Sequence, residues 1–196
     1  MKELEIRLSG SGGQGILLIG RILAEALTLE KLNVAQSQSY EPTSRGGLSR
    51  SDLVASAEAV DYPLATGLDY LVVLHKIAAG ASDSLLKDNS LIVVDSPLAQ
   101  LYSAPKGRSV LLPISETAKA LGSIRSTNMV ALGALMTLAD ICAGETVLKA
   151  IEKVAPGKLV ESATEAFHEG GRIAREYLAA GQPAQQPVER VPLASV

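Results

Sequence analysis

The 196-residue chain has little of the residue types from which many functional sites are built. Its single cysteine, Cys142, excludes an internal disulfide and a self-contained iron–sulfur or Cys-type zinc site. With no tryptophan, one phenylalanine and five tyrosines, it lacks the aromatic residues of a base-stacking surface. A net charge of −3, without a stripe of lysine and arginine, further argues against nucleic acid as a partner.

The chain also lacks a long apolar run. Its most apolar stretch, residues 129–138, is too short to cross a bilayer. Charged and apolar residues alternate from the start, Met1-Lys2-Glu3-Leu4-Glu5, which is unlike a signal peptide. We therefore expect a cytoplasmic protein without membrane contact. Its length predicts one domain, residues 1–179, followed by a proline-rich tail, 180–196, that is either disordered or lies on a partner.

Strand signals alternate with helix signals up to residue 115, after which only helices are expected. The predicted strands are 3–9, 34–39, 48–56, 71–74, 91–94 and 109–112, and the predicted helices are 14–29, 115–121, 127–142, 145–154 and 158–179. This order predicts an α/β fold, a three-layer α/β/α domain with a largely parallel or mixed sheet and a helical C-terminal third.

The most informative motif is a glycine-dense turn between the first strand and the first helix. It contains Gly10, Gly12, Gly13, Gln14 and Gly15. Such a turn exposes backbone N–H groups at the positive end of a helix dipole, which suits an anion such as a nucleotide phosphate. The alternative is that the glycines only allow close packing of strand and helix.

Two common phosphate sites fit this turn poorly. A P-loop needs lysine and serine or threonine where Ile16 and Leu17 stand, so NTP hydrolysis is excluded. A dinucleotide site calls for an acidic residue at the end of the second strand, yet no carboxylate occurs there before Glu41. NAD is thus disfavoured, and a generic anion site or a contact with another chain remains.

A second glycine site follows the second strand. It contains Ser44, Arg45, Gly46 and Gly47, in which Arg45 could bind a phosphate or carboxylate through two hydrogen bonds. Because both glycine turns follow strands that leave the sheet in the same direction, we expect them to form one pocket at the carboxyl edge. The alternative is an ordinary surface loop.

Residues suited to catalysis are scarce. His75 and His168 have no second histidine nearby in the sequence and are expected to be structural or surface residues. Asp95, before Ser96 and Pro97, suits either a site carboxylate or a turn. No triad, zinc or paired-acid motif is present, so we assign no catalytic residue and no metal ligand. A binding surface without a catalytic set is typical of a subunit.

Four segments in a consistent order resemble the gamma subunit of 2-oxoacid:ferredoxin oxidoreductases. They are Gly10–Leu18, Ser39–Asp52, Asn128–Leu135 and Ala166–Gly170, and the resemblance spans about residues 3–178. Carried over, it implies that both glycine turns bind cofactor or substrate, and that Asn128 either caps a helix or faces the same region. The form of the second segment favours the 2-oxoglutarate members.

The resemblance also implies an activity and partners. The family oxidatively decarboxylates a 2-oxoacid with coenzyme A to acyl-CoA, CO₂ and reduced ferredoxin. Thiamine diphosphate, Mg and [4Fe-4S] clusters are expected in the alpha, beta and delta subunits, so this chain binds none of them alone. Its partners would be those subunits, with ferredoxin as the electron acceptor of the complex. A homodimer is one state open to the isolated chain.

The expected function is therefore a non-catalytic gamma subunit that shapes the passage for coenzyme A. Two alternatives stay open: a stand-alone Rossmann-type nucleotide-binding oxidoreductase, and a pure assembly scaffold whose glycine turns touch only protein.

Overall fold

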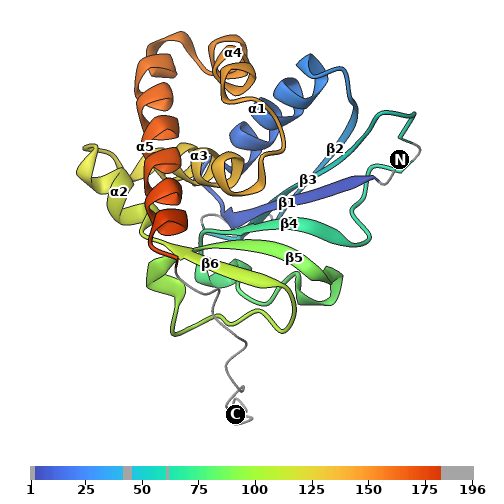
Figure 1. Cartoon of the computed structure of the whole chain (residues 1–196), viewed down its shortest axis with the longest axis horizontal. Helices are drawn as coiled ribbons and strands as arrows, with labels where there is room; N and C mark the ends of the chain where they lie inside the picture. The colour runs from blue at the N-terminus through green and yellow to red at the C-terminus, as the bar shows by residue number, and fades with distance from the viewer. Residues whose placement is uncertain (1–2, 42–45, 61, 182–196) are drawn as a thin grey trace.

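A six-stranded mixed sheet organises the protein (Figure 1). The computed structural model describes residues 3–41, 46–60 and 62–181. The strands are β1 (Leu4–Ser11), β2 (Asn33–Tyr40), β3 (Leu48–Ser56), β4 (Leu68–Val73), β5 (Leu86–Asp95) and β6 (Arg108–Leu112), in the order β2-β3-β1-β4-β5-β6. Only β3 runs against its neighbours, since it is antiparallel to both β1 and β2, whereas β1, β4, β5 and β6 are parallel.

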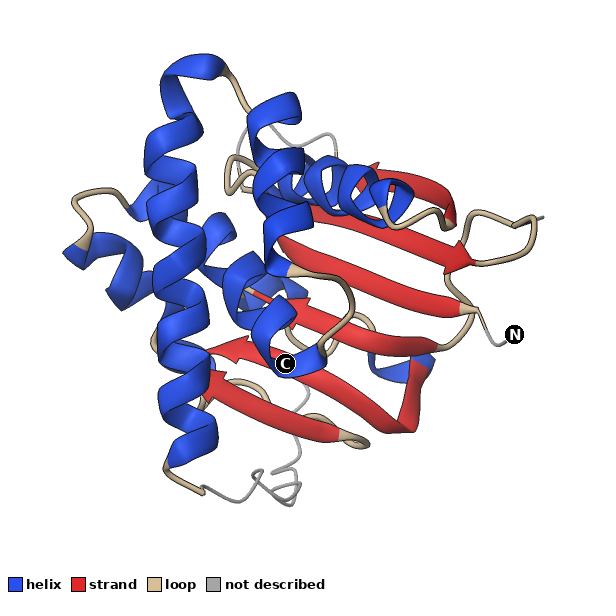
Figure 2. Cartoon of the chain, turned by 45° about the horizontal axis from the view of Figure 1, so that its top comes forward, coloured by secondary structure: helices blue, strands red, loops and turns tan. Residues whose placement is uncertain are grey.

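The long helices lie on one face of this sheet (Figures 1 and 2). They are α1 (Ile16–Leu29), α2 (Ile114–Ala120), α3 (Thr127–Ala139), α4 (Gly144–Val154) and α5 (Val160–Ala179). The α/β class, the mixed sheet and the helical C-terminal third predicted from the sequence are confirmed. Among the described residues, no helix is both long and apolar enough to cross a membrane.

Each face of the sheet has its own apolar core. The larger core lies under the helices and contains Val72 and Val93, whereas a smaller core on the opposite face contains Leu71 and Ile92. Alternate side chains of β4 and β5 thus enter opposite cores, which explains their unbroken apolar sequences. Short 3₁₀ turns, not long helices, supply residues such as Ala78 and Leu98 to the smaller core.

Helix α3 is the centre of the larger core. Every residue from Thr127 to Met136 is buried, so the helix has no solvent-facing stripe. The predicted end at residue 142 is too late, because Asp140 takes a left-handed conformation with φ of 49° and stops the helix. Ser126 and Thr127 are residue types that favour the N-cap position, yet neither caps α3 with its side chain. A 3₁₀ turn, Ile124–Ser126, runs directly into α3, and the Thr127 hydroxyl donates to the Ile124 carbonyl at 2.6 Å.

Helices α3 and α5 touch through their backbones, without side chains between them. A Cβ atom on Gly133 of α3 would collide with the Phe167 carbonyl of α5, and one on Gly170 of α5 would collide with the Val130 carbonyl of α3. Both glycines lie in segments on which the family resemblance rests. Their function in this structure is to let two helices cross at minimal distance.

We predict that Gly133→Ala lowers the free energy of unfolding by about 3 kcal/mol, because the added methyl group forces the two helices apart. Urea denaturation followed by circular dichroism measures the loss. Gly144→Ala in α4 is the matched control, since its Cβ would enter open space and should leave stability nearly unchanged. Equal stability of the two variants would contradict the packing argument.

Candidate functional site

The first glycine turn lies between β1 and α1. Gly10 still belongs to β1, Gly12 and Gly13 form an exposed turn, and Gly15 precedes the first residue of α1. Gly13 and Gly15 have φ angles of 92° and 73°, a left-handed conformation that strongly favours glycine. The turn therefore depends on glycine for its shape as well as for access to its backbone.

The second glycine turn meets the first at one edge of the sheet, and the pocket expected there stays a prediction. The Gly12 N–H donates a hydrogen bond to the Gly47 carbonyl at 2.8 Å. The meeting follows from topology, because β1 and β2 both run antiparallel to β3 and their carboxyl ends reach the same edge. Gly46 is exposed there, with φ of 79°. The predicted residues Ser44 and Arg45 lie outside the described residues.

Gln14 braces the first turn from within. Its side-chain Oε1 accepts from the Ser11 N–H at 2.8 Å, and its Nε2 donates to the Leu74 carbonyl at 3.1 Å. A Cβ on Gly10 would lie 2.6 Å from that Oε1 atom, so Gly10 makes room for the brace. In this structure Gln14 and Gly10 hold the turn in place and link the end of β1 to the end of β4.

Asn128 supports the same turn from α3. It is buried, its Nδ2 donates to the Gly15 carbonyl at 3.2 Å, and its Oδ1 accepts from the Met129 N–H at 2.8 Å. A Cβ on Gly15 would collide with this amide. Asn128 is the second residue of α3 and not its cap, so of the two roles considered from the sequence the structure shows the contact with the glycine turn.

Exposed backbone is what the two turns offer chemically. Within the described ranges, no acceptor is hydrogen-bonded to the amides of Gly13 and Gly15, which precede α1. Such amides at a helix N-terminus can bind a phosphate or carboxylate oxygen. Near this edge, the Nδ1 of His75 accepts from the Ile77 N–H at 3.3 Å in the 3₁₀ turn that follows β4.

We predict that Gln14→Leu destabilises the protein by about 1–3 kcal/mol, because it leaves the Ser11 amide and the Leu74 carbonyl without their partner. Chemical denaturation measures the change. Gln38→Leu on the exposed side of β2 is the control, and it should change stability by less than about 0.5 kcal/mol. If Gln14→Leu were as stable as that control, Gln14 would not be a structural brace.

Asp95 serves the structure at the carboxyl end of β5. The carboxylate is 4% exposed, and its Oδ1 accepts from the Ser115 N–H at the start of α2 at 3.0 Å. Burial raises the pKa of Asp95 above its ordinary value of 3.8, although the hydrogen bonds from Ser115 and Ile114 oppose the shift. The predicted turn-forming role is not seen, because the Asp95 side chain makes no capping hydrogen bond in the turn Ser96–Leu98 and instead links β5 to α2.

We predict that Asp95→Asn is more thermostable than the parent protein at pH 7. Because the pKa of Asp95 is raised in the folded protein, ionised Asp95 lowers the free energy of unfolding at pH values above its unfolded-state pKa. This cost disappears as the pH falls and the carboxyl group becomes protonated in both the folded and the unfolded state. Melting temperatures between pH 7 and pH 3.5 should therefore converge for the two proteins. Asp88→Asn, at an exposed carboxylate, should follow the parent at every pH.

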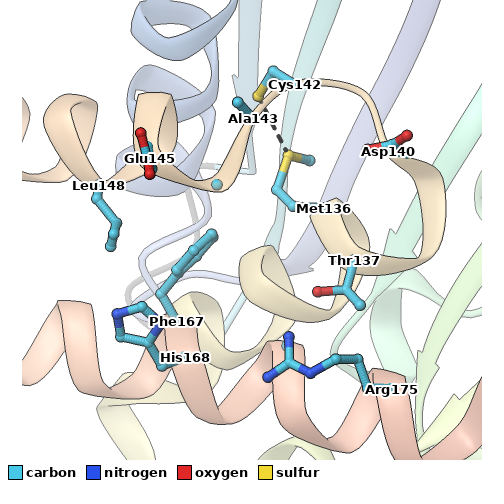
Figure 3. A pocket seen from close by; sticks show the side chains of 12 residues that line it. Met136, Thr137, Asp140, Cys142, Ala143, Glu145, Leu148, Phe167, His168 and Arg175 are labelled. Atoms are coloured by element: carbon cyan, nitrogen blue, oxygen red, sulfur yellow. Dashed lines mark hydrogen bonds between the residues drawn. The ribbon is translucent and has the colours of Figure 1, made fainter.

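A separate cavity of about 570 Å³ opens where the end of α3, the start of α4 and the middle of α5 meet (Figure 3). Sequence reasoning missed it, since it forms only when three helices come together. Its lining includes Asp140, Glu145, His168 and Arg175, so both signs of charge are present. Burial raises the pKa of Cys142 in its wall to about 11, which keeps this thiol protonated at neutral pH.

Comparison with known proteins adds to this geometry. The family model described as pyruvate ferredoxin/flavodoxin oxidoreductase matches residues 5–173, which include both glycine turns, Asn128 and the crossing of α3 and α5. The chain belongs to this family. The resemblance inferred from the four sequence segments is confirmed.

Curated relatives and solved structures agree with this family. The chain is 37% identical to 2-oxoglutarate synthase subunit KorC of Methanocaldococcus jannaschii over 88% of this chain and 94% of the relative, and 38% identical to KorC of Archaeoglobus fulgidus over 70% and 71%. It is similar in structure to the gamma subunit of a keto/oxoacid ferredoxin oxidoreductase from Geobacter sulfurreducens, with a TM-score of 0.81, 35% identity, and 90% and 99% of the two chains covered.

A larger family enzyme contains the same fold within a longer chain. The 2-oxoglutarate:ferredoxin oxidoreductase from Magnetococcus marinus, solved with 2-oxoglutarate, coenzyme A and succinyl-CoA, matches with a TM-score of 0.78 and 27% identity. The match covers 90% of the chain described here but 32% of the longer Magnetococcus marinus chain. Our chain is therefore homologous to subunits of 2-oxoacid:ferredoxin oxidoreductases, and its fold also occurs fused to other parts of such an enzyme.

Proposed function

We propose that the chain is the gamma subunit of a cytoplasmic 2-oxoglutarate:ferredoxin oxidoreductase, and that its glycine turns form part of the passage for coenzyme A. The observation that carries the proposal is the hydrogen bond from Gly12 N–H to the Gly47 carbonyl, which joins the two turns at one edge of the sheet. Backbone amides at this edge suit the phosphates of coenzyme A.

The chemistry of decarboxylation belongs to other subunits in this proposal. A cluster needs several thiolates, and the chain has one cysteine, whose pKa is raised. Thiamine diphosphate, Mg and [4Fe-4S] clusters are accordingly assigned to the alpha, beta and delta subunits, with ferredoxin as electron acceptor. The gamma subunit contributes binding and positioning of coenzyme A, not acid–base catalysis.

The alternative of a Rossmann-type dinucleotide enzyme is disfavoured by the described geometry. Glu41, the first carboxylate after β2, accepts from the Leu48 N–H through its Oε2 at 3.1 Å. It therefore closes the connection between β2 and β3 and is not placed as a free acceptor for ribose hydroxyls. The scaffold alternative makes a different prediction, because glycine turns that touch only protein should affect assembly without affecting coenzyme A.

We predict that Gly46→Asp raises the KM for coenzyme A about tenfold relative to Gly46→Asn in the complex purified with its other subunits. No described residue lies within 4 Å of a Cβ built on Gly46, and Asp and Asn tolerate its positive φ about equally, so the two variants differ mainly in charge. The negative charge should repel the phosphates. Ferredoxin reduction assays measure both KM and kcat.

Two further measurements separate the alternatives. The KM for 2-oxoglutarate should be the same in the two variants, because this substrate is bound by other subunits. Equal KM values for coenzyme A, combined with weaker association of Gly46→Asp with its partners, would favour the scaffold. Micromolar binding of NAD to the isolated chain would favour the dinucleotide enzyme.

A further inference from the structure

The face of the sheet opposite the long helices carries a buried charged cluster that the sequence reading did not single out. Arg7 of β1 and Asp52 of β3 are cross-strand neighbours, 7% and 6% exposed. The Arg7 guanidinium donates to both carboxylate oxygens of Asp52, from Nε at 2.7 Å and from Nη2 at 2.6 Å, and its Nη1 donates to the Ser82 hydroxyl at 3.1 Å. The charge of Asp52 is therefore fully engaged by Arg7.

Arg50 adds a second cation to this cluster. It lies two residues before Asp52 on β3, and so on the same face, because the intervening Ser51 points to the helix side, toward Gly20 of α1. Arg7, Asp52 and Arg50 together carry a net charge of +1. No hydrogen bond or ion pair links Arg50 to another residue within the described part of the chain.

Two orphaned polar atoms coincide at this position. The Nε of Arg50 and the Oγ of Ser9 are buried without a hydrogen-bond partner, and these are the two such side-chain atoms found among the described residues. Ser9 and Arg50 are direct cross-strand partners of β1 and β3. Burial, and then the positive charge of Arg7, lower the pKa of Arg50, while the negative charges of Asp52 and Glu41 act in the other direction. A buried donor without a partner, next to a second cation, favours an incoming anion.

The location connects this cation to the glycine turns. Arg50 is three residues beyond Gly47, whose carbonyl accepts from Gly12, and Ser9 is three residues before Gly12. The cluster therefore lies within three residues of the sheet edge at which the two turns meet, on the face opposite the long helices. The long side chain of arginine can reach toward that edge. Its guanidinium group offers several hydrogen-bond donors in a fixed geometry, which suits an oxyanion.

We propose that Arg50 binds a phosphate group of coenzyme A that enters along the glycine turns. This inference rests on the proposed function and deepens it, because it names the side chain that recognises the charged part of the substrate. A carboxylate of a partner subunit is the other oxyanion that could meet the same donors, and the experiment distinguishes the two sources.

The test uses the complete complex with Arg50→Gln, Arg50→Lys and the control Arg21→Gln, an exposed arginine of α1. We expect Arg50→Gln to raise the KM for coenzyme A about tenfold or more, since a charge-assisted hydrogen bond is lost, and Arg50→Lys to cause a smaller rise. Turnover with pantetheine, which has no phosphate, should not change. Arg21→Gln should match the parent in both assays.

The other outcomes overturn the inference. An unchanged KM for coenzyme A, with weaker binding of the Arg50→Gln chain to its partner subunits, would assign the oxyanion to a partner carboxylate. No change in either measurement would leave Arg50 without an oxyanion ligand. If Arg50→Gln does not fold, the coenzyme A and pantetheine assays on Arg50→Lys decide alone. If Gly46→Asp raises the KM for coenzyme A relative to Gly46→Asn but Arg50→Gln leaves this KM unchanged, the inference is refuted and the proposed function stands. If neither substitution changes the KM for coenzyme A, both are refuted.

Discussion

The antiparallel strand β3 is the constraint on which the candidate site depends. By lying between β1 and β2 and opposing both, it makes those two strands parallel to each other and brings their carboxyl ends to one edge. The Gly12–Gly47 hydrogen bond then joins the turns across the gap. The same strand also places Asp52 and Arg50 on the face of the sheet that lies opposite the long helices. A binding edge and a charged cluster behind it thus follow from a single topological feature.

Glycine has two different functions in this protein. At Gly13, Gly15 and Gly46 it permits positive φ angles, so that tight turns present backbone at the edge of the sheet. At Gly133 and Gly170 the φ angles are ordinary, and the missing side chain instead lets α3 and α5 touch. The two functions are linked, because the first turn of α3 contains Asn128, whose amide donates to the Gly15 carbonyl. Close packing of the helices therefore supports the position of the turn.

Much of the local structure could be predicted from the sequence because local patterns determine it. The strand at residues 48–56 was predicted with its exact bounds, and the apolar runs in β4 and β5 correctly indicated burial on both faces. Errors occurred where a neighbouring element competes with a single-residue signal, and where partners are far apart in sequence. Ser126 and Thr127 are good capping residues in isolation, yet a preceding 3₁₀ turn displaces them from that role. The Arg7–Asp52 pair lies 45 positions apart in sequence and has no local signal beyond charge within a strand.

The sequence by itself determined the class of fold, the two glycine turns and the poverty of catalytic side chains, since periodicity, glycine and residue counts are local or additive properties. Only the tertiary structure decided which of these groups meet: Gly12 with Gly47, Gln14 with Leu74, and Asn128 with Gly15. It also decided that the buried Nε of Arg50 finds no hydrogen-bond partner in the described part of the chain, because Asp52 is already engaged by Arg7. Such pairings depend on strand order and register, which no short stretch of sequence contains.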